Sequence, residues 1–257
     1  MTTNSFTGKT ALIIGGTSGM GKATAKLLLS LGAKVIVASK SGKSVDAAVA
    51  ELGKHGEVTG KVLNLTDDAD VKRFVQEISE FDRIDYLVNA SGIFRPKPFL
   101  DSTPEDYDAF LNINRGFFFV TQAVAKKQKA NGGGAIVNIG SYWATHAVKG
   151  TPTTAYSMAK AGLQSFTQHI AMELAADKIR VNAIAPGVVE TNVLDGVFGS
   201  HQAAQEAYKG LAGIHPLGRN GHVTEIASVI AYLLSDEAEW ITGAVWAVDG
   251  GMAAGRS

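Results

Sequence analysis

The stretch TALIIGGTSGMG (residues 10–21) determines the fold that we expect for this chain. It begins with an apolar run typical of a buried β-strand and continues into residues 20–32, whose apolar side chains recur with helical spacing. Between them lie Gly15, Gly19 and Gly21, which allow a sharp turn and a close approach of the backbone. The helix after such a turn directs free N–H groups and a positive dipole end towards an anion. This context favours a dinucleotide-binding turn over a tight turn without a ligand.

Strands and helices alternate along the rest of the chain. Further strands are expected at residues 34–39, 61–65, 84–91, 135–141, 179–187 and 244–251. Helices are expected at residues 20–32, 44–53, from 67 onwards, and at 104–130, 153–177 and 223–236. The strands are continuously apolar, which indicates that helices cover both faces of the sheet.

The alternation predicts an α/β fold, a Rossmann-type doubly wound parallel sheet of about seven strands with helices on both faces. We expect residues 1–257 to form a single domain, because no linker-like composition divides the chain. Residues from about 190 to 215 have the least regular pattern, and we expect them to form a lid over a substrate.

The composition argues against several classes of partner. Lys and Arg total 24 and so do Asp and Glu, so the chain lacks the basic field that favours nucleic acid or an anionic membrane. No apolar run approaches the ~20 residues of a membrane span. The chain has no cysteine, which excludes disulfides and Cys-ligated metals, and no His, Asp or Glu cluster has the spacing of a metal site. The first residues lack a secretory signal pattern, so we expect a cytoplasmic protein.

The end of the second strand bears on the choice of dinucleotide. NAD-binding folds often carry an acidic residue there for the ribose 2′-hydroxyl, whereas NADP-binding folds supply a group for the 2′-phosphate. Ser39 occupies this position and Lys40 follows, and both can donate to a phosphate. We therefore expect NADP(H), with NAD(H) as the alternative if Lys40 is only a solvated loop residue.

Seven motifs in a fixed order resemble the short-chain dehydrogenase/reductase family over the full length of the chain. They are the GxxxGxG turn at 15–21, LNLTDD, LVNASG, LNINRG, IVNIGS, YSMAK and RVNAIAPGVVET. Two departures are visible, since Asn64 stands where Asp is usual and Ala90–Ser91 replace the usual Asn–Ala. The interval between Ser141 and Tyr156 is also slightly longer than usual, and an enlarged loop beside the substrate pocket should absorb the difference.

The resemblance implies which residues hold the cofactor. They are Gly15, Thr17, Ser18, Gly19, Met20, Gly21, Ser39, Lys40, Asn64, Leu65, Asn89, Ala90, Ser91, Gly92, Tyr156, Lys160, Pro186, Gly187, Val189 and Thr191. Within this set the backbone of Val189 is expected to reach the nicotinamide carboxamide.

The resemblance also implies a catalytic set of Asn114, Ser141, Tyr156 and Lys160. Tyr156 and Lys160 lie one helical turn apart, so an ammonium can stand beside a phenol. A free tyrosine has a pKa near ~10, and a nearby cation lowers it towards the range of a useful acid or base. Ser141 is expected to polarise the substrate oxygen, and Asn114 to hold a water that links Lys160 to solvent.

The expected activity is NADP(H)-dependent interconversion of a ketone or aldehyde and an alcohol by hydride transfer. The alternatives are an NAD-dependent alcohol, polyol or sterol dehydrogenase with the same site, or an NADP-binding sensor or scaffold that has lost catalysis. Phe94, Trp143, His146 and Val193 are the expected substrate-pocket residues, and the substrate is a small molecule. The resemblance further implies a homotetramer.

Overall fold

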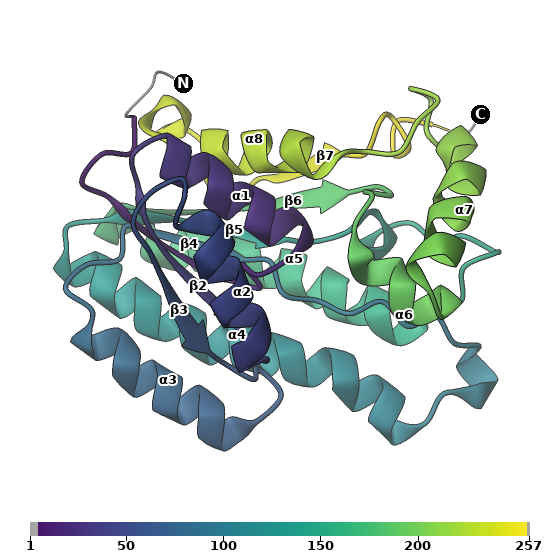
Figure 1. Cartoon of the computed structure of the whole chain (residues 1–257), viewed down its shortest axis with the longest axis horizontal. Coiled ribbons are helices and arrows are strands. Elements are labelled where there is room, and N and C mark those ends of the chain that lie inside the picture. The colour runs from purple at the N-terminus through teal and green to yellow at the C-terminus, as the bar shows by residue number, and fades with distance from the viewer. Residues whose placement is uncertain (1–4, 256–257) are drawn as a thin grey trace.

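The computed structural model describes residues 5–255 (Figure 1). Its strands form one parallel sheet in the order β3-β2-β1-β4-β5-β6-β7. The strands are β1 (Thr10–Ile14), β2 (Lys34–Ser39), β3 (Val58–Val62), β4 (Tyr86–Asn89), β5 (Gly134–Ile139), β6 (Ile179–Pro186) and β7 (Val245–Val248). The predicted doubly wound sheet is confirmed. Its strand order reverses between β1 and β4, and ligands of such sheets bind at the carboxyl ends of the strands beside this point.

Helices cover both faces of the sheet, as predicted. They are α1 (Gly19–Ser30), α2 (Gly42–Leu52), α3 (Asp68–Glu80), α4 (Pro104–Ala130), α5 (Thr154–Leu174), α6 (Asp195–Phe198), α7 (His201–Leu211) and α8 (Val223–Leu234). Along β1, Ala11 and Ile13 point to a core built with α1, α2 and α8, whereas Leu12 and Ile14 point to a core built with α3, α4 and α5. Both sides of the central strands are therefore buried, which explains their continuous apolar sequence.

A buried polar network joins the two central strands to the helices behind them. The Asn89 side chain at the end of β4 donates through Nδ2 to Thr121 Oγ1 on α4 at 2.9 Å and to Asn138 Oδ1 on β5 at 2.8 Å. Asn138 in turn donates to Thr167 Oγ1 on α5 at 2.9 Å. Buried hydrogen bonds of this kind are costly to break, so the network fixes the carboxyl ends of β4 and β5 against α4 and α5.

Two predicted elements differ in the structure. Strand β3 occupies Val58–Val62 and not 61–65, because it pairs with β2 in the register Val35↔Val58 to Ser39↔Val62. Leu63 and Leu65 are buried after the strand ends, which explains the misleading apolar pattern. The segment 190–215 is also more regular than expected, since it contains α7, whose Ser200 cap accepts from the Ala203 N–H. Within residues 5–255, no helix is long and apolar enough to cross a membrane.

Candidate active site

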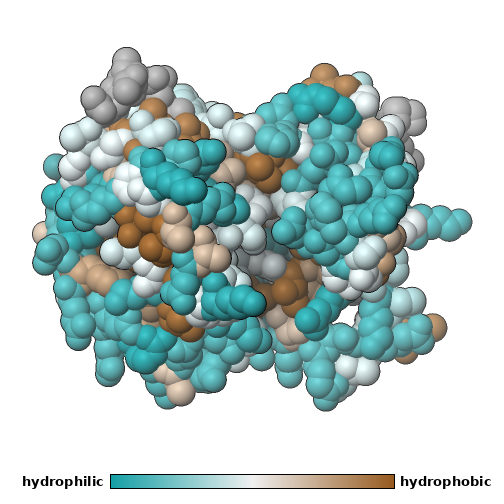
Figure 2. All heavy atoms as spheres, in the orientation of Figure 1, coloured by the Kyte–Doolittle hydropathy of each residue, from teal (hydrophilic) through white to brown (hydrophobic). Residues whose placement is uncertain are grey.

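A cavity of about 710 Å³ lies at the carboxyl edge of the sheet, beside the reversal of strand order. Figure 2 shows the molecule hollowed between the body of the sheet and the side that carries α6 and α7. Loops after β1, β4, β5 and β6 line it together with α5. Nineteen of the predicted residues do so: Gly15, Thr17, Ser18, Gly19, Met20, Ser39, Ala90, Ser91, Gly92, Phe94, Ser141, Trp143, Tyr156, Lys160, Pro186, Gly187, Val189, Thr191 and Val193.

The turn before α1 leaves an anion site open at one end of the cavity. Ser18 occupies the N-cap position of α1, yet its side chain caps no backbone N–H. The free amides of the first turn can therefore bind a phosphate. Gly19 has a left-handed backbone with φ +51°, and a Cβ there would lie 3.3 Å from Thr191 Cγ2. A side chain at this position would fill the gap between the turn and the 187–191 segment, so the glycine keeps room for a pyrophosphate.

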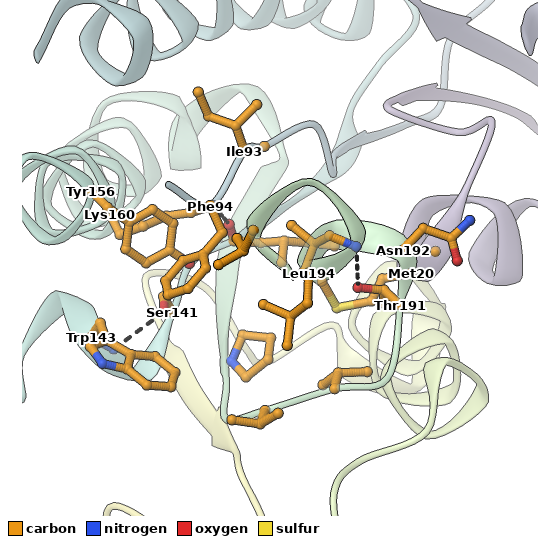
Figure 3. A pocket seen from close by; sticks show the side chains of 18 of the residues that line it. Met20, Ile93, Phe94, Ser141, Trp143, Tyr156, Lys160, Thr191, Asn192 and Leu194 are labelled. Atoms are coloured by element: carbon orange, nitrogen blue, oxygen red, sulfur yellow. Dashed lines mark hydrogen bonds between the residues drawn. The ribbon is translucent and has the colours of Figure 1, made fainter. Parts of the chain in front are cut away.

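Ser141, Tyr156 and Lys160 meet on one wall of the cavity (Figure 3). Ser141 follows β5, is buried, and forms a side-chain hydrogen bond with Tyr156. Tyr156 and Lys160 come from successive turns of α5, and the Lys160 Nζ lies 5.9 Å from the centre of the Tyr156 ring. Lys160 also donates to the carbonyl oxygen of Ile139 at 2.7 Å, which fixes its ammonium at the end of β5.

The protein environment moves the pKa values of both titratable groups. Burial raises the pKa of Tyr156, and the hydrogen bond with Ser141 opposes that shift. Burial also lowers the pKa of Lys160 to about 8. The expected net lowering of the tyrosine pKa is therefore wrong for the chain without cofactor, because desolvation of the phenolate outweighs its stabilisation. At neutral pH the site holds a protonated phenol next to a charged ammonium.

Asn114 lies behind this wall and does not line the cavity. Its Nδ2 donates to the carbonyl oxygen of Ala159 at 2.7 Å, one residue before Lys160. The amide therefore joins α4 to α5 at the turn that carries the lysine. Its expected role in holding a water for Lys160 remains a prediction.

Aromatic side chains enclose Tyr156. The Phe94 ring packs edge-on against it at 5.2 Å, and Trp143 lies 6.3 Å beyond Phe94. Phe110 on α4 also packs edge-on against Tyr156, with 5.9 Å between the ring centres, and no sequence motif indicated it. Phe110 precedes Asn114 by four residues on the same helix, and this spacing was the available sign that both lie on the face towards the site.

The loop between Ser141 and Tyr156 forms part of the wall of the cavity. Gly150, Thr151 and Pro152 line the cavity. The Lys97 backbone N–H donates to the carbonyl oxygen of Pro152 at 2.8 Å, which joins this loop to the one after β4. The two loops therefore form one continuous wall.

Three predicted cofactor residues on the adenine side have other surroundings. Lys40 is exposed and outside the cavity lining, next to Ser39, which lines it. The Asn64 side-chain oxygen already accepts from the backbone N–H and the hydroxyl of Thr66. Leu65 is buried against Gly116 of α4. A Cβ added to Gly116 would lie only 2.5 Å from the Leu65 carbonyl oxygen. The structure therefore brings none of these three residues to the cavity, and Ser39 is the predicted residue of the adenine side that lines it.

Three further predicted residues support the site from outside its lining. A Cβ on Gly21 would lie 2.3 Å from the carbonyl oxygen of Gly15, so Gly21 permits packing within the turn. The Asn89 amide is used in the network with Thr121 and Asn138 and faces away from the cavity. His146 stacks on the Tyr142 ring at 4.4 Å and does not reach the cavity. Local motifs did not reveal which way these side chains point.

The turn at residues 187–191 offers a backbone amide to the cavity. A parallel bridge to Gly221 uses the carbonyl oxygen of Val188 at 2.9 Å and the N–H of Glu190 at 3.0 Å. Among the described residues, the N–H and C=O of Val189 between them have no partner, although Val189 is only 7% exposed. Buried backbone groups normally have partners, so the pair points to a ligand with both a donor and an acceptor. The carboxamide of a nicotinamide fits this requirement.

Comparison with known proteins agrees with this geometry. Residues 15–253 match a family model described as enoyl-(acyl carrier protein) reductase. The chain is 40% identical over 248 residues to the 3-oxoacyl-[acyl-carrier-protein] reductase FabG of Thermotoga maritima, covering 95% of this chain and 98% of that protein. It is 33% identical over 248 residues to a 3alpha-hydroxysteroid dehydrogenase of Mediterraneibacter gnavus, covering 94% and 96%.

A solved structure extends the comparison to the fold. The L-sorbose reductase of Gluconobacter frateurii, complexed with NADPH and L-sorbose, superposes with a TM-score of 0.88 at 25% identity and 98% coverage of both chains. The family resemblance inferred from the motifs is therefore confirmed. The chain belongs to the short-chain dehydrogenase/reductase family of oxidoreductases.

Proposed function

We propose that this chain is an NADP(H)-dependent oxidoreductase that interconverts a ketone or aldehyde and the corresponding alcohol. The observation that carries the proposal is the meeting of Ser141, Tyr156 and Lys160 on one wall of the cavity. The uncapped α1 turn and the unpaired amide of Val189 lie on the lining of the same cavity. One pocket therefore combines an acid–base group with positions for the pyrophosphate and the nicotinamide of a dinucleotide.

The proposed mechanism assigns the proton to the protein and the hydride to the cofactor. When bound, the nicotinamide supplies or accepts the hydride. In the reductive direction Tyr156 donates its phenolic proton to the carbonyl oxygen, and its raised pKa keeps that proton in place at neutral pH. Ser141 donates a hydrogen bond to the same oxygen. The Lys160 ammonium stabilises the phenolate that remains, and Asn114 holds the turn of α5 that carries Lys160.

The preference for NADP(H) rests on the end of β2. Ser39 lines the cavity there, and neither it nor the exposed Lys40 would repel a 2′-phosphate as an acidic residue would. The similar L-sorbose reductase was solved with NADPH. Lys40→Ala should raise the KM for NADPH and leave that for NADH unchanged. Lys34→Ala, at the exposed opposite end of β2, is the matched control. An unchanged KM for NADPH would contradict the assignment.

The cavity favours an uncharged substrate with apolar bulk. Among the described residues that line it, Lys160 is the only charged one, so no second cation is available for a substrate carboxylate or phosphate. Phe94, Trp143 and Leu194 supply apolar surface around Tyr156 (Figure 3). The 3alpha-hydroxysteroid dehydrogenase among the relatives favours an alicyclic ketone as one candidate, and an NAD-dependent sterol dehydrogenase remains the alternative function.

A cofactor-matched screen tests the proposal. Uncharged alicyclic and aryl ketones are compared with small keto acids and sugars, with NADPH and NADH, by absorbance of the reduced nicotinamide. Tyr156→Phe should abolish turnover and retain NADPH binding. Wild-type protein that binds NADPH but turns over no substrate would favour the sensor or scaffold alternative. Turnover retained in Tyr156→Phe would remove the mechanism.

We also propose that the chain assembles through the outer face of α4 and α5. Phe118 and Phe119 on α4 and Met158 and Met172 on α5 are exposed apolar residues on these two helices. Exposed apolar side chains of this size on neighbouring helices are typical of a contact between subunits. With a second two-fold contact through the last strand and helix, light scattering after gel filtration should give a homotetramer, and Phe118→Asp should lower the mass.

The segment at about 190–215 is the proposed lid. Leu194, Val197 and Phe198 line the cavity from the short helices that follow β6, and Leu211 lines it from the end of α7. Closure of this segment over a bound substrate would exclude water from the proton transfer.

A further inference from the structure

Two side chains from the segment after the 187–191 turn hold its two ends. His215 Nε2 accepts from the backbone N–H of Val188 at 3.1 Å. The Tyr208 hydroxyl accepts from the Thr191 N–H at 3.2 Å and donates to the Thr191 carbonyl oxygen at 2.9 Å. His215 is 3% exposed and Tyr208 is 1% exposed, so water cannot easily replace either partner. These bonds surround Val189, whose own amide is unpaired.

The histidine is held in a defined chemical state. Because Nε2 accepts a hydrogen bond, the ring must be neutral and carry its proton on Nδ1. Two glycines make room for it. A Cβ on Gly187 would lie 3.0 Å from Nε2, and a Cβ on Gly250 would lie 3.3 Å from the His215 Cβ. The ring is thus packed between the turn and the C-terminal segment, with its acceptor directed at the turn.

The tyrosine belongs to a second chain of hydrogen bonds. Asn220 Nδ2 donates to the Tyr208 carbonyl oxygen at 2.7 Å and to Glu190 Oε1 at 3.3 Å. Tyr208 lies on α7, in the proposed lid, and also lines the cavity. Tyr208 on α7 and His215 after it therefore connect the lid segment to the 187–191 turn through hydrogen bonds on both sides of Val189.

We propose that His215 and Tyr208 are positioning residues that shape the 187–191 turn so that the Val189 amide faces the nicotinamide carboxamide. The inference rests on the proposed function. Neither residue touches the reacting atoms. Removing either acceptor leaves a buried backbone N–H unpaired, and the turn must then move to recover a partner. The nicotinamide end of the cofactor would lose its contact, whereas the adenosine end, at β2 and α1, would not.

The experiment compares two ligands and three variants. NADPH carries the nicotinamide, whereas adenosine 2′,5′-bisphosphate carries only the adenosine end. Glutamine places its amide oxygen near the Nε2 position of a histidine, whereas asparagine reaches only to the Nδ1 position. Binding of both ligands by calorimetry is measured for wild type, His215→Gln, His215→Asn and Tyr208→Phe. Thermal unfolding checks that each variant is folded.

We expect His215→Asn and Tyr208→Phe to bind NADPH about tenfold more weakly, which corresponds to about 1.4 kcal/mol. Binding of the bisphosphate should stay at the wild-type value, and His215→Gln should retain most of the NADPH affinity. Equal losses for both ligands, or equal behaviour of the Gln and Asn variants, would overturn the proposal. If one variant does not fold, the remaining ones still decide between these outcomes. Wild-type protein that binds neither ligand would instead refute the proposed function.

Discussion

Replacing Lys160 by methionine should stabilise the protein while removing its activity. Burial lowers the pKa of Lys160 from 10.5 to about 8. Since one pKa unit corresponds to about 1.36 kcal/mol, keeping this ammonium charged in the folded chain at pH 7 costs about 3 kcal/mol. The Lys160→Met variant avoids this cost but loses the hydrogen bond from the charged ammonium to Ile139, worth about 2 kcal/mol. The net gain should be about 1 kcal/mol in the free energy of unfolding at pH 7.

The pH dependence of this stability difference shows whether the buried charge of Lys160 causes it. A lysine with a lowered folded-state pKa binds fewer protons when folded than when unfolded between pH 8 and 10.5, so wild-type stability rises across that window. The advantage of Lys160→Met should therefore shrink by about 2 kcal/mol between pH 7 and pH 9.5.

Urea unfolding of the cofactor-free protein at the two pH values measures this difference. Lys72→Met on the exposed side of α3 is the matched control. A stability difference that does not change with pH, or a variant less stable than wild type at pH 7, would refute the reasoning.

Three further predictions follow from individual contacts. Gly19→Ala should weaken NADPH binding in a titration and destabilise the protein by about 1 kcal/mol, because its left-handed backbone disfavours a Cβ. Asn138→Ala should lower the free energy of unfolding by about 2–3 kcal/mol in urea, since it removes two buried hydrogen bonds, one from the Asn89 amide and one to the Thr167 hydroxyl. Trp143→Ala should shift the ratio of kcat/KM values towards bulkier ketones, and an unchanged ratio would place the tryptophan outside the substrate site.

Local sequence patterns predicted the parts of the site whose geometry is local. The glycine spacing at 15–21 specifies a strand–turn–helix unit, and the bounds of α4 follow from its capping box at Thr103 and Asp106 and from the glycines after Ala130. Tyr156 and Lys160 need only one helix to stand side by side. These features depend on residues a few positions apart, so a single sequence is sufficient to find them.

The remaining features depend on contacts between distant segments. The register of β3 is set by pairing with β2, which an apolar pattern cannot reveal. Asn89 faces Thr121 and Asn138 because β4 lies beside β5 and α4, and His215 meets Val188 only in the folded chain. The direction of the Tyr156 pKa shift depends on how deeply the phenol is enclosed, and that is a property of the whole cavity.

The hydrogen bond from the Lys97 N–H to the Pro152 carbonyl oxygen constrains how this enzyme can diversify. It makes the loops after β4 and β5 a matched pair, so an insertion in one loop must be accommodated by the other. Ser141 lies two residues after β5, at the border of this pair of loops, and Tyr156 and Lys160 stand on α5, outside it. Grafting both loops together from a relative should therefore transfer substrate preference and leave the proton-transfer groups intact. A graft of one loop alone would leave either the Lys97 N–H or the Pro152 carbonyl oxygen without its partner.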